Sequence, residues 1–167
     1  MPSVCSDDRK AIRDAVDFLY GRGHRVISLL ITKMNTLNNL VRAGAFEEYT
    51  AGYGGRLRGS VIRTESRFLN AVPLERYVEK LPADCTAVIA PVEAFGNRLY
   101  KILKALRPEA ALIPWCYPLH DYAAATGIPF MRQDFRSLAE TAVKMLQDQL
   151  QGMPVSNSFV PYIFNRS

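Results

Sequence analysis

The sequence predicts an α/β protein built on a parallel sheet with helices on both faces. Short apolar runs alternate with longer stretches in which apolar residues recur at helical spacing. The runs are nearly continuous in apolar character, which is typical of strands that are covered on both faces. Strand-length and helix-length segments in this order indicate right-handed crossovers between parallel strands.

The composition fits one globular domain. The chain has 167 residues, of which 49% are hydrophobic, and its net charge of +5 is scattered without a basic tract. Cys5, Cys85 and Cys116 form no CxxC pair and lie near no histidine at metal-ligand spacing, so we expect free thiols, no metal and no cofactor. Because no signal peptide or membrane-spanning run is apparent, we expect a cytoplasmic protein.

The first predicted elements are a capped helix and a buried strand. The Ser-Asp-Asp run at 6–8 can cap a helix whose apolar pairs recur every four residues. These pairs are Ala11 and Ile12, Ala15 and Val16, and Leu19 and Tyr20. Gly21 and Gly23 end this helix, and the apolar run at 26–31 then predicts a strand.

The same alternation predicts the rest of the chain. Helices are expected at about 36–49, 73–81 and 93–106, and strands at about 60–63, 86–90 and 110–113. The segment 114–129, rich in aromatic residues and proline, breaks the rhythm. A long helix with a one-sided apolar face follows at 134–151 and stops at Gly152, and 158–164 reads as a final strand.

Residues that could carry chemistry have simpler structural interpretations. His24 stands between a helix stop and a strand, where a turn or packing role is commoner than a general base. Adjacent residues such as His120 and Asp121 do not place their side chains together automatically, and nothing near Cys116 would lower its pKa. Helix capping explains the acidic pair at 7–8 without a phosphoacceptor or a magnesium site.

A cleft-type constellation remains, formed by Arg42, Trp115, Tyr117, Gln133 and Phe135. In an open parallel sheet, ligands bind outside the carboxyl ends of the strands, where Trp115 and Tyr117 are expected. Aromatic faces stack on rings, and the forked donors of an arginine fix hydroxyl or carboxylate groups. The alternative is a set of ordinary core aromatics with a surface arginine.

Four segments in order resemble the effector-binding domain of the LacI/GalR family of transcriptional regulators. The segment GHRVISLL at 23–30 resembles the family's GH-R-I-A, and RAGAF at 42–46 its R-x-x-G-F. The segment TAVIA at 86–90 is similar to its P-T-A-[IV] strand, and RQDF at 132–135 opens a helix as in the family. The fold is shared with periplasmic sugar-binding proteins and is also fused in GntR-type regulators.

The resemblance implies a periplasmic-binding-protein-like type I fold, one lobe plus part of the other. It assigns about 1–130 to a second-lobe unit, about 131–152 to a crossing segment and helix, and 153–167 to a C-terminal strand. It implies effector contact by Arg42 and places Gln133 and Phe135 in the crossing segment. At two positions where the family has sugar-binding residues, this chain differs: it has Val92-Glu93 at one and the segment 114–117 at the other. The family's specificity for sugars is therefore not carried over to this chain.

We therefore expect the effector-binding and dimerisation region of a bacterial transcriptional regulator, without enzymatic chemistry. Its expected partners are a small effector, a sugar or related polar metabolite, and a second copy of the chain. The helix at 134–151 would expose its apolar face unless a partner covers it. DNA would be bound only through a head domain absent from this chain, and no membrane is involved. The alternatives are a solute-binding protein, or a flavodoxin-like enzyme using Cys116 or the His120-Asp121 pair, with a receiver domain third.

Overall fold

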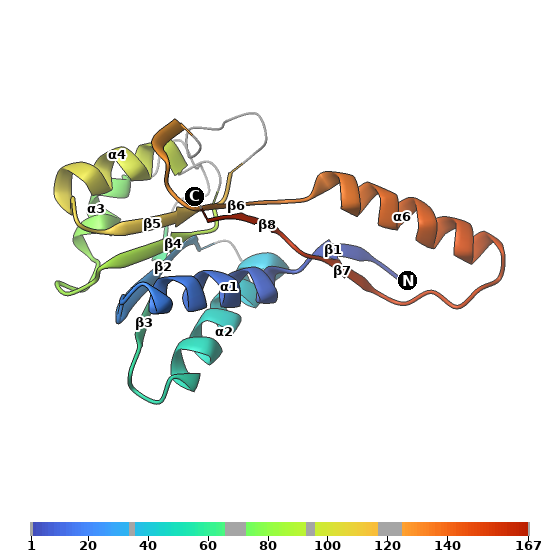
Figure 1. Cartoon of the computed structure of the whole chain (residues 1–167), viewed down its shortest axis with the longest axis horizontal. Helices are drawn as coiled ribbons and strands as arrows, with labels where there is room; N and C mark the ends of the chain where they lie inside the picture. Colours follow the sequence, from blue (N-terminus) through green and yellow to red (C-terminus); the bar gives the residue numbers. More distant parts are fainter. Residues whose placement is uncertain (1, 34–35, 66–72, 93–95, 117–124, 167) are drawn as a thin grey trace.

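The computed structural model describes residues 2–33, 36–65, 73–92, 96–116 and 125–166 (Figure 1). In the body of the molecule, strands and helices alternate as the sequence predicts. These elements are α1 (Asp8–Gly21), β2 (Val26–Thr32), α2 (Leu37–Gly52), β3 (Arg58–Thr64), α3 (Leu74–Glu79), β4 (Ala87–Ala90), α4 (Gly96–Leu106) and β5 (Ala111–Pro114). The remaining elements are β1 (Val4–Ser6), β6 (Phe130–Arg132), α6 (Phe135–Leu150), β7 (Ser158–Val160) and β8 (Ile163–Asn165).

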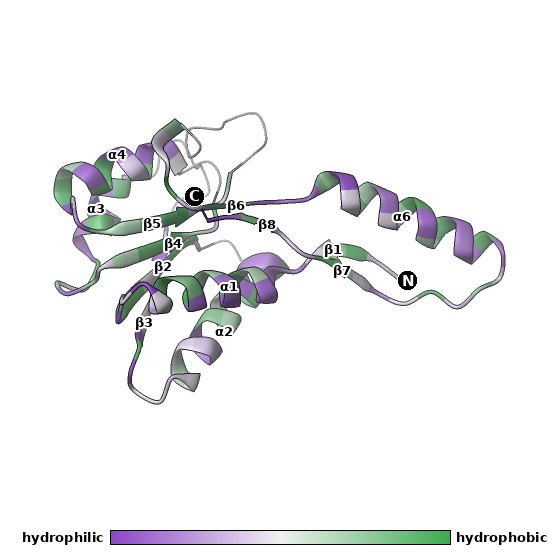
Figure 2. Ribbon diagram, viewed as in Figure 1, coloured by the Kyte–Doolittle hydropathy of each residue, from purple (hydrophilic) through white to green (hydrophobic). Residues whose placement is uncertain are grey.

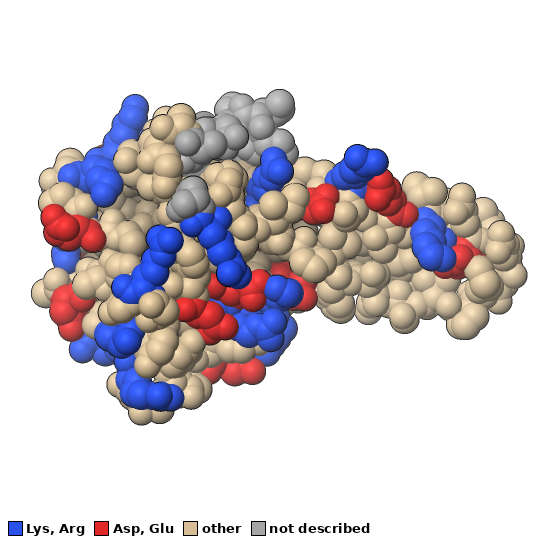
Figure 3. Space-filling view, in the orientation of Figure 1, with Lys and Arg blue, Asp and Glu red and all other residues tan. Residues whose placement is uncertain are grey.

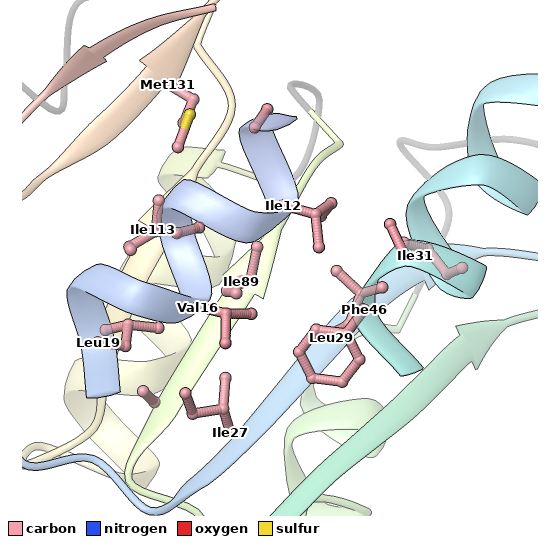
Figure 4. Packing of buried hydrophobic residues seen from close by; sticks show 14 of the residues in the cluster. Ile12, Val16, Leu19, Ile27, Leu29, Ile31, Phe46, Ile89, Ile113 and Met131 are labelled. Atoms are coloured by element: carbon pink, nitrogen blue, oxygen red, sulfur yellow. The ribbon is translucent and has the colours of Figure 1, made fainter. Parts of the chain in front are cut away.

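The central sheet is parallel and has the order β3-β2-β4-β5. Alternate side chains of β2 point to opposite faces, so that Ile27 and Leu29 pack with α1 and α2, whereas Leu30 packs with α3 and α4. Figure 4 shows the first of these layers, where Ile12 and Val16 of α1 lie against the strands. The prediction of a parallel sheet covered by helices on both faces is confirmed.

A second part of the molecule extends away from this sheet as an arm (Figure 1). It consists of α6 and the parallel pair β1 and β7, and the antiparallel pair β6 and β8 joins it to the body. Helix α6 has no buried residue, although apolar side chains recur along it (Figure 2). Val143, Leu146 and Leu150 are 56%, 57% and 80% exposed, so the apolar face expected at 134–151 is uncovered.

The strands that follow β5 differ from the sequence prediction for physical reasons. The single strand expected at 158–164 is two strands, β7 and β8, separated at Pro161, whose ring nitrogen cannot donate to a ladder. Strand β6 was not expected, because it has only three residues and no alternating pattern of its own. Its place is set by pairing with β8 and by a bridge between Met131 and Trp115.

Gly59 marks a close approach between β3 and α2. A Cβ atom on Gly59 would lie 2.6 Å from Thr50 Oγ1 and 2.9 Å from Phe46 Cε1. Because both neighbours are buried, we expect Gly59→Ala to lower the free energy of unfolding by about 1–3 kcal/mol, the usual effect of overpacking. Urea denaturation would measure this loss.

Gly44→Ala is a matched control for Gly59→Ala. Gly44 lies in the middle of α2 with open space around it, so we expect alanine there to raise the free energy of unfolding by up to about 1 kcal/mol. A loss of stability in both variants, or in neither, would contradict the packing argument.

Among the described residues, no helix is both long and apolar enough to span a membrane.

Candidate functional site

A buried polar cluster lies where the strands of the central sheet end. Arg42, in the second turn of α2, donates from Nε to Asp8 Oδ1 over 2.8 Å and from Nη1 to the carbonyl oxygen of Pro91 over 2.8 Å. Its Nη2 lies 3.0 Å from the hydroxyl of Tyr162, and that hydroxyl donates to Asp8 Oδ1 over 2.8 Å. Two side chains and the backbone carbonyl that follows β4 therefore meet at one guanidinium group.

Trp115 completes this group, which we call the Arg42 cluster (Asp8, Arg42, Trp115 and Tyr162). Trp115 follows β5 directly and is 1% exposed. Its ring meets the ring of Tyr162 edge-on with centroids 5.6 Å apart, and the Arg42 guanidinium carbon lies 6.0 Å from the ring centroid. Within the described part of the chain, Trp115 Nε1 has no hydrogen-bond partner.

The ion pair between Arg42 and Asp8 is largely shielded from water, since the two side chains are 11% and 7% exposed. Burial by itself lowers the pKa of Arg42, but the charge of Asp8 and the bonds to Tyr162 outweigh it, so the pKa of Arg42 is raised. The pKa of Tyr162 is also raised, chiefly by burial, which keeps its hydroxyl protonated as a donor to Asp8. The cluster is thus a fixed charge pair with a neutral phenol beside it.

The cluster still has hydrogen-bonding capacity. A guanidinium carries five N–H donors, and its three nitrogen atoms each make one bond here, so two N–H groups of Arg42 have no partner among the described residues. Only Oδ1 of Asp8 accepts hydrogen bonds within the described residues, and Oδ2 has none there. Two N–H groups of Arg42, Oδ2 of Asp8 and the indole N–H of Trp115, all without partners in the described part of the chain, therefore lie together.

The structure places the five residues that the sequence nominated in three different situations. Arg42 and Trp115 lie together in the Arg42 cluster. Gln133 Nε2 donates to Ser6 Oγ over 3.0 Å, at the base of the arm, and Phe135 is the first residue of α6, 45% exposed. Tyr117 lies outside the described residues.

Sequence reasoning missed Asp8 and Tyr162 as members of the site. Capping explained the pair at 7–8, and Asp7 does accept from Lys10 N as the cap of α1. Asp8 has a different role, because it forms the ion pair with Arg42. The sequence did contain a signal for this role: Asp7 alone is enough to cap the helix, so a second acid beside it needs another explanation. Tyr162 gave no signal, because 120 residues separate it from Arg42.

The three cysteines are not members of the Arg42 cluster. Cys85 and Cys116 are buried, and Cys5 is exposed. The His120-Asp121 pair lies outside the described residues, as do 93–95. Among the residues that are described, no three His, Cys, Asp or Glu side chains gather as a metal site would require.

His24 packs at the opposite end of the sheet, where its Nδ1 lies 3.0 Å from Thr86 Oγ1. Burial lowers the pKa of His24, and the charges of Arg22 and Arg25 lower it further.

The unfolded chain therefore binds more protons at the His24 side chain than the folded chain does as the pH falls below 6.5, the ordinary pKa of histidine. We expect the contribution of His24 to stability to be complete above pH 6.5 and to be lost progressively on acidification. Urea midpoints from pH 7.5 to 5 would show a smaller decline in His24→Gln than in the parent; equal declines would contradict the role of His24.

The chain was compared with known proteins. No family model matches it. It is 20% identical over 166 residues to YkvZ of Bacillus subtilis strain 168, which is described as an uncharacterized HTH-type transcriptional regulator. The aligned region covers 96% of this chain and 51% of the relative.

Solved structures match nearly the whole chain. A LacI family transcriptional regulator from Bifidobacterium animalis subsp. lactis DSM 10140 has a TM-score of 0.81 and 20% identity, over 98% of this chain and 62% of its own. A periplasmic binding protein/LacI transcriptional regulator from Alkaliphilus metalliredigens QYMF, complexed with D-xylulofuranose, has a TM-score of 0.75 and 15% identity, over 99% and 64%. A dimeric Lac repressor has a TM-score of 0.75 and 17% identity, over 97% and 61%. The chain spans about half the length of the curated relative and less than two thirds of each of these structures.

Proposed function

The chain has the fold of the effector-binding domains of LacI-family regulators, and from this premise we propose that it is the effector-binding region of a bacterial transcriptional regulator. It binds a small polar molecule at the Arg42 cluster and performs no chemistry on it. The observation that carries the proposal is the unused hydrogen-bonding capacity of Arg42 and Asp8 beside the buried indole of Trp115.

The chemistry of the cluster favours a ligand with several hydroxyl groups. Neighbouring hydroxyls of a sugar or polyol accept from the free N–H groups of Arg42 and donate to Asp8 Oδ2 at the same time. The aromatic faces of Trp115 and Tyr162 suit the apolar face of such a ring. The complex of the Alkaliphilus protein with D-xylulofuranose agrees with this class of ligand.

The Arg42 cluster is also placed to report ligand binding to the rest of the protein. Arg42 belongs to α2, Asp8 begins α1, and Tyr162 lies between β7 of the arm and β8. A ligand that draws Arg42 or Asp8 toward itself alters bonds that tie the arm to the body. In the regulator, this would bias the orientation of the arm and, through it, a DNA-binding head.

Ligand titrations test this function. Trp115 is the only tryptophan, so its fluorescence reports directly on the cluster. D-Xylulose, other pentoses, hexoses and polyols would be screened by thermal shift, because a ligand at 100 times its Kd stabilises the folded state by about 2.7 kcal/mol. We expect a saturable change in Trp115 fluorescence with at least one of them.

Two variants make the test specific. Tyr162→Phe removes one hydroxyl from the cluster and should weaken binding, whereas Arg13→Gln removes an exposed cation of α1 that pairs with Asp14 and is not a member of the cluster, and should not. No thermal shift with any sugar or polyol, or equal affinity in Tyr162→Phe and the parent, would overturn the assignment.

We further propose that two copies associate through the apolar face of α6. Val143, Leu146 and Leu150 form this face, and in the view of Figure 3 charged side chains lie in a row along one part of the arm while the rest of it is uncharged. Leu146→Glu should give a monomer by light scattering at micromolar concentration, where the parent is a dimer. Gln147→Glu, an equal charge at an exposed neighbouring position, should remain dimeric; a parent chain that is itself monomeric would refute the interface.

A further inference from the structure

A cavity lies at the end of the sheet opposite to the Arg42 cluster. It encloses about 160 Å³. The Arg42 cluster gathers residues that follow β4 and β5, whereas this cavity is lined by His24, which precedes β2, and by Ala110 and Ala111 at the start of β5. The end of α1, the second half of α4 and residues 127–129 close it. It is therefore a separate site, independent of the function proposed above.

The walls of this cavity are mainly apolar and aromatic. They include Phe18 and Leu19 of α1, Tyr100 and Leu103 of α4, and Ile128 and Pro129. An apolar cavity of about 150 Å³ is large enough to hold benzene. The size and the lining thus favour a molecule with one ring over a sugar or a nucleotide.

Two cationic side chains that line the cavity, Arg22 and Lys104, form no ion pair within the described residues. Arg22 stacks over the ring of Phe18, with 4.2 Å from the guanidinium carbon to the centroid, and Lys104 Nζ donates to the carbonyl oxygen of Pro108. Within the part of the chain that the structure describes, neither has a carboxylate within 4.0 Å, although Arg9, Arg42 and Arg58 all have one. The lowered pKa of His24, caused by burial and then by Arg22 and Arg25, agrees with a positive potential here.

A backbone donor faces the same space. The N–H groups of Ala111 and Trp115 donate to Thr86 and Ala90, on the β4 side of β5. Because successive residues of a strand alternate in direction, the N–H of Leu112 points to the other edge, toward the cavity that Leu112 lines. Strand β6 meets β5 only farther along, at Trp115 and Met131.

We propose that this cavity binds a small aromatic carboxylate. The ring lies among the side chains of α1 and α4, and the carboxylate faces Arg22, Lys104 and the N–H of Leu112. A free phosphate is disfavoured, because most of the lining offers no hydrogen-bond donors to replace its water. Since the site and the Arg42 cluster occupy opposite ends of the same strands, such a ligand is a second input to the same domain.

Benzoate is the probe for this site, and benzamide is its uncharged counterpart. In amide-resolved NMR titrations of the full chain, we expect benzoate to shift the resonances of Leu112 and His24 in a saturable way. Benzamide should bind about tenfold more weakly, because it lacks one charge-assisted hydrogen bond. Trp115 fluorescence should not change, since Trp115 lies at the other end of β5.

Matched variants separate this site from general attraction of anions. Arg22→Gln and Lys104→Gln should each weaken benzoate binding several-fold, whereas Arg13→Gln, which removes a cation from the exposed side of the same helix α1, should leave it unchanged. Equal affinity for benzoate and benzamide, equal losses in all three variants, shifts centred on Trp115, or no saturable shift at millimolar benzoate would each overturn the proposal.

Discussion

Arg42→Gln is expected to lower the free energy of unfolding by about 3–5 kcal/mol, the usual result of breaking a buried ion pair by removing one partner. The carboxylate of Asp8 is 7% exposed and would lose the cation that pairs with it. The carbonyl oxygen of Pro91 and the hydroxyl of Tyr162 would each lose a donor in the same step. Glutamine is too short to reach all three acceptors, so the loss should exceed that of one hydrogen bond.

The double variant Asp8→Asn/Arg42→Gln shows whether the buried charge is the cause. Removing both charges leaves two amides in a polar site, so we expect the double variant to be more stable than Arg42→Gln alone. Urea unfolding monitored by circular dichroism gives the four free energies of the cycle. Additive losses at Asp8 and Arg42 would mean that the two residues act independently and would contradict the paired geometry.

The body of the fold was predictable because the spacing of apolar residues within each strand and helix indicates which of its sides are buried. Strand β2 is a nearly continuous apolar run because both faces of the sheet are covered by helices, and Ile27 and Leu30 pack on opposite faces. Helix α1 shows its four-residue recurrence because only one of its sides, with Ile12 and Val16, meets the sheet. The end of α2 was less predictable: it runs on to Gly52, beyond the expected end at 49, and Thr50 in this last turn is buried where α2 closely approaches Gly59 of β3.

The site was only half predictable for the same reason. Arg42 and Trp115 could be nominated because their side-chain chemistry suits a ligand and because Trp115 follows a strand. Asp8 and Tyr162 join them through tertiary structure, in a contact between residues 154 positions apart. No local pattern encodes such a contact. The spacing of apolar residues predicted helix α6, but it did not predict that the whole helix would lie away from the core.

Trp115→Ala is expected to cost about 3–5 kcal/mol of unfolding free energy, the range for deleting a large buried aromatic side chain. Trp115 is 1% exposed and fills the space between the sheet, Met131 of β6 and Tyr162. Trp115→Phe keeps part of this apolar contact and removes the N–H donor that has no partner among the described residues, so it should cost less than Trp115→Ala. Chemical denaturation followed by circular dichroism compares the two variants without the lost fluorophore.

The same pair of variants separates a structural role of Trp115 from a binding role. If the indole N–H is reserved for a ligand, Trp115→Phe should weaken binding of the sugar or polyol found in the screen by about tenfold while leaving the fold nearly intact, because one hydrogen bond to the ligand is lost. Calorimetric titration measures this affinity, and Tyr77→Phe, a buried phenol against α4, provides a control of similar size away from the cluster. An unchanged affinity in Trp115→Phe would show that the indole serves packing alone, and the ligand would then depend on Arg42 and Asp8 for its hydrogen bonds.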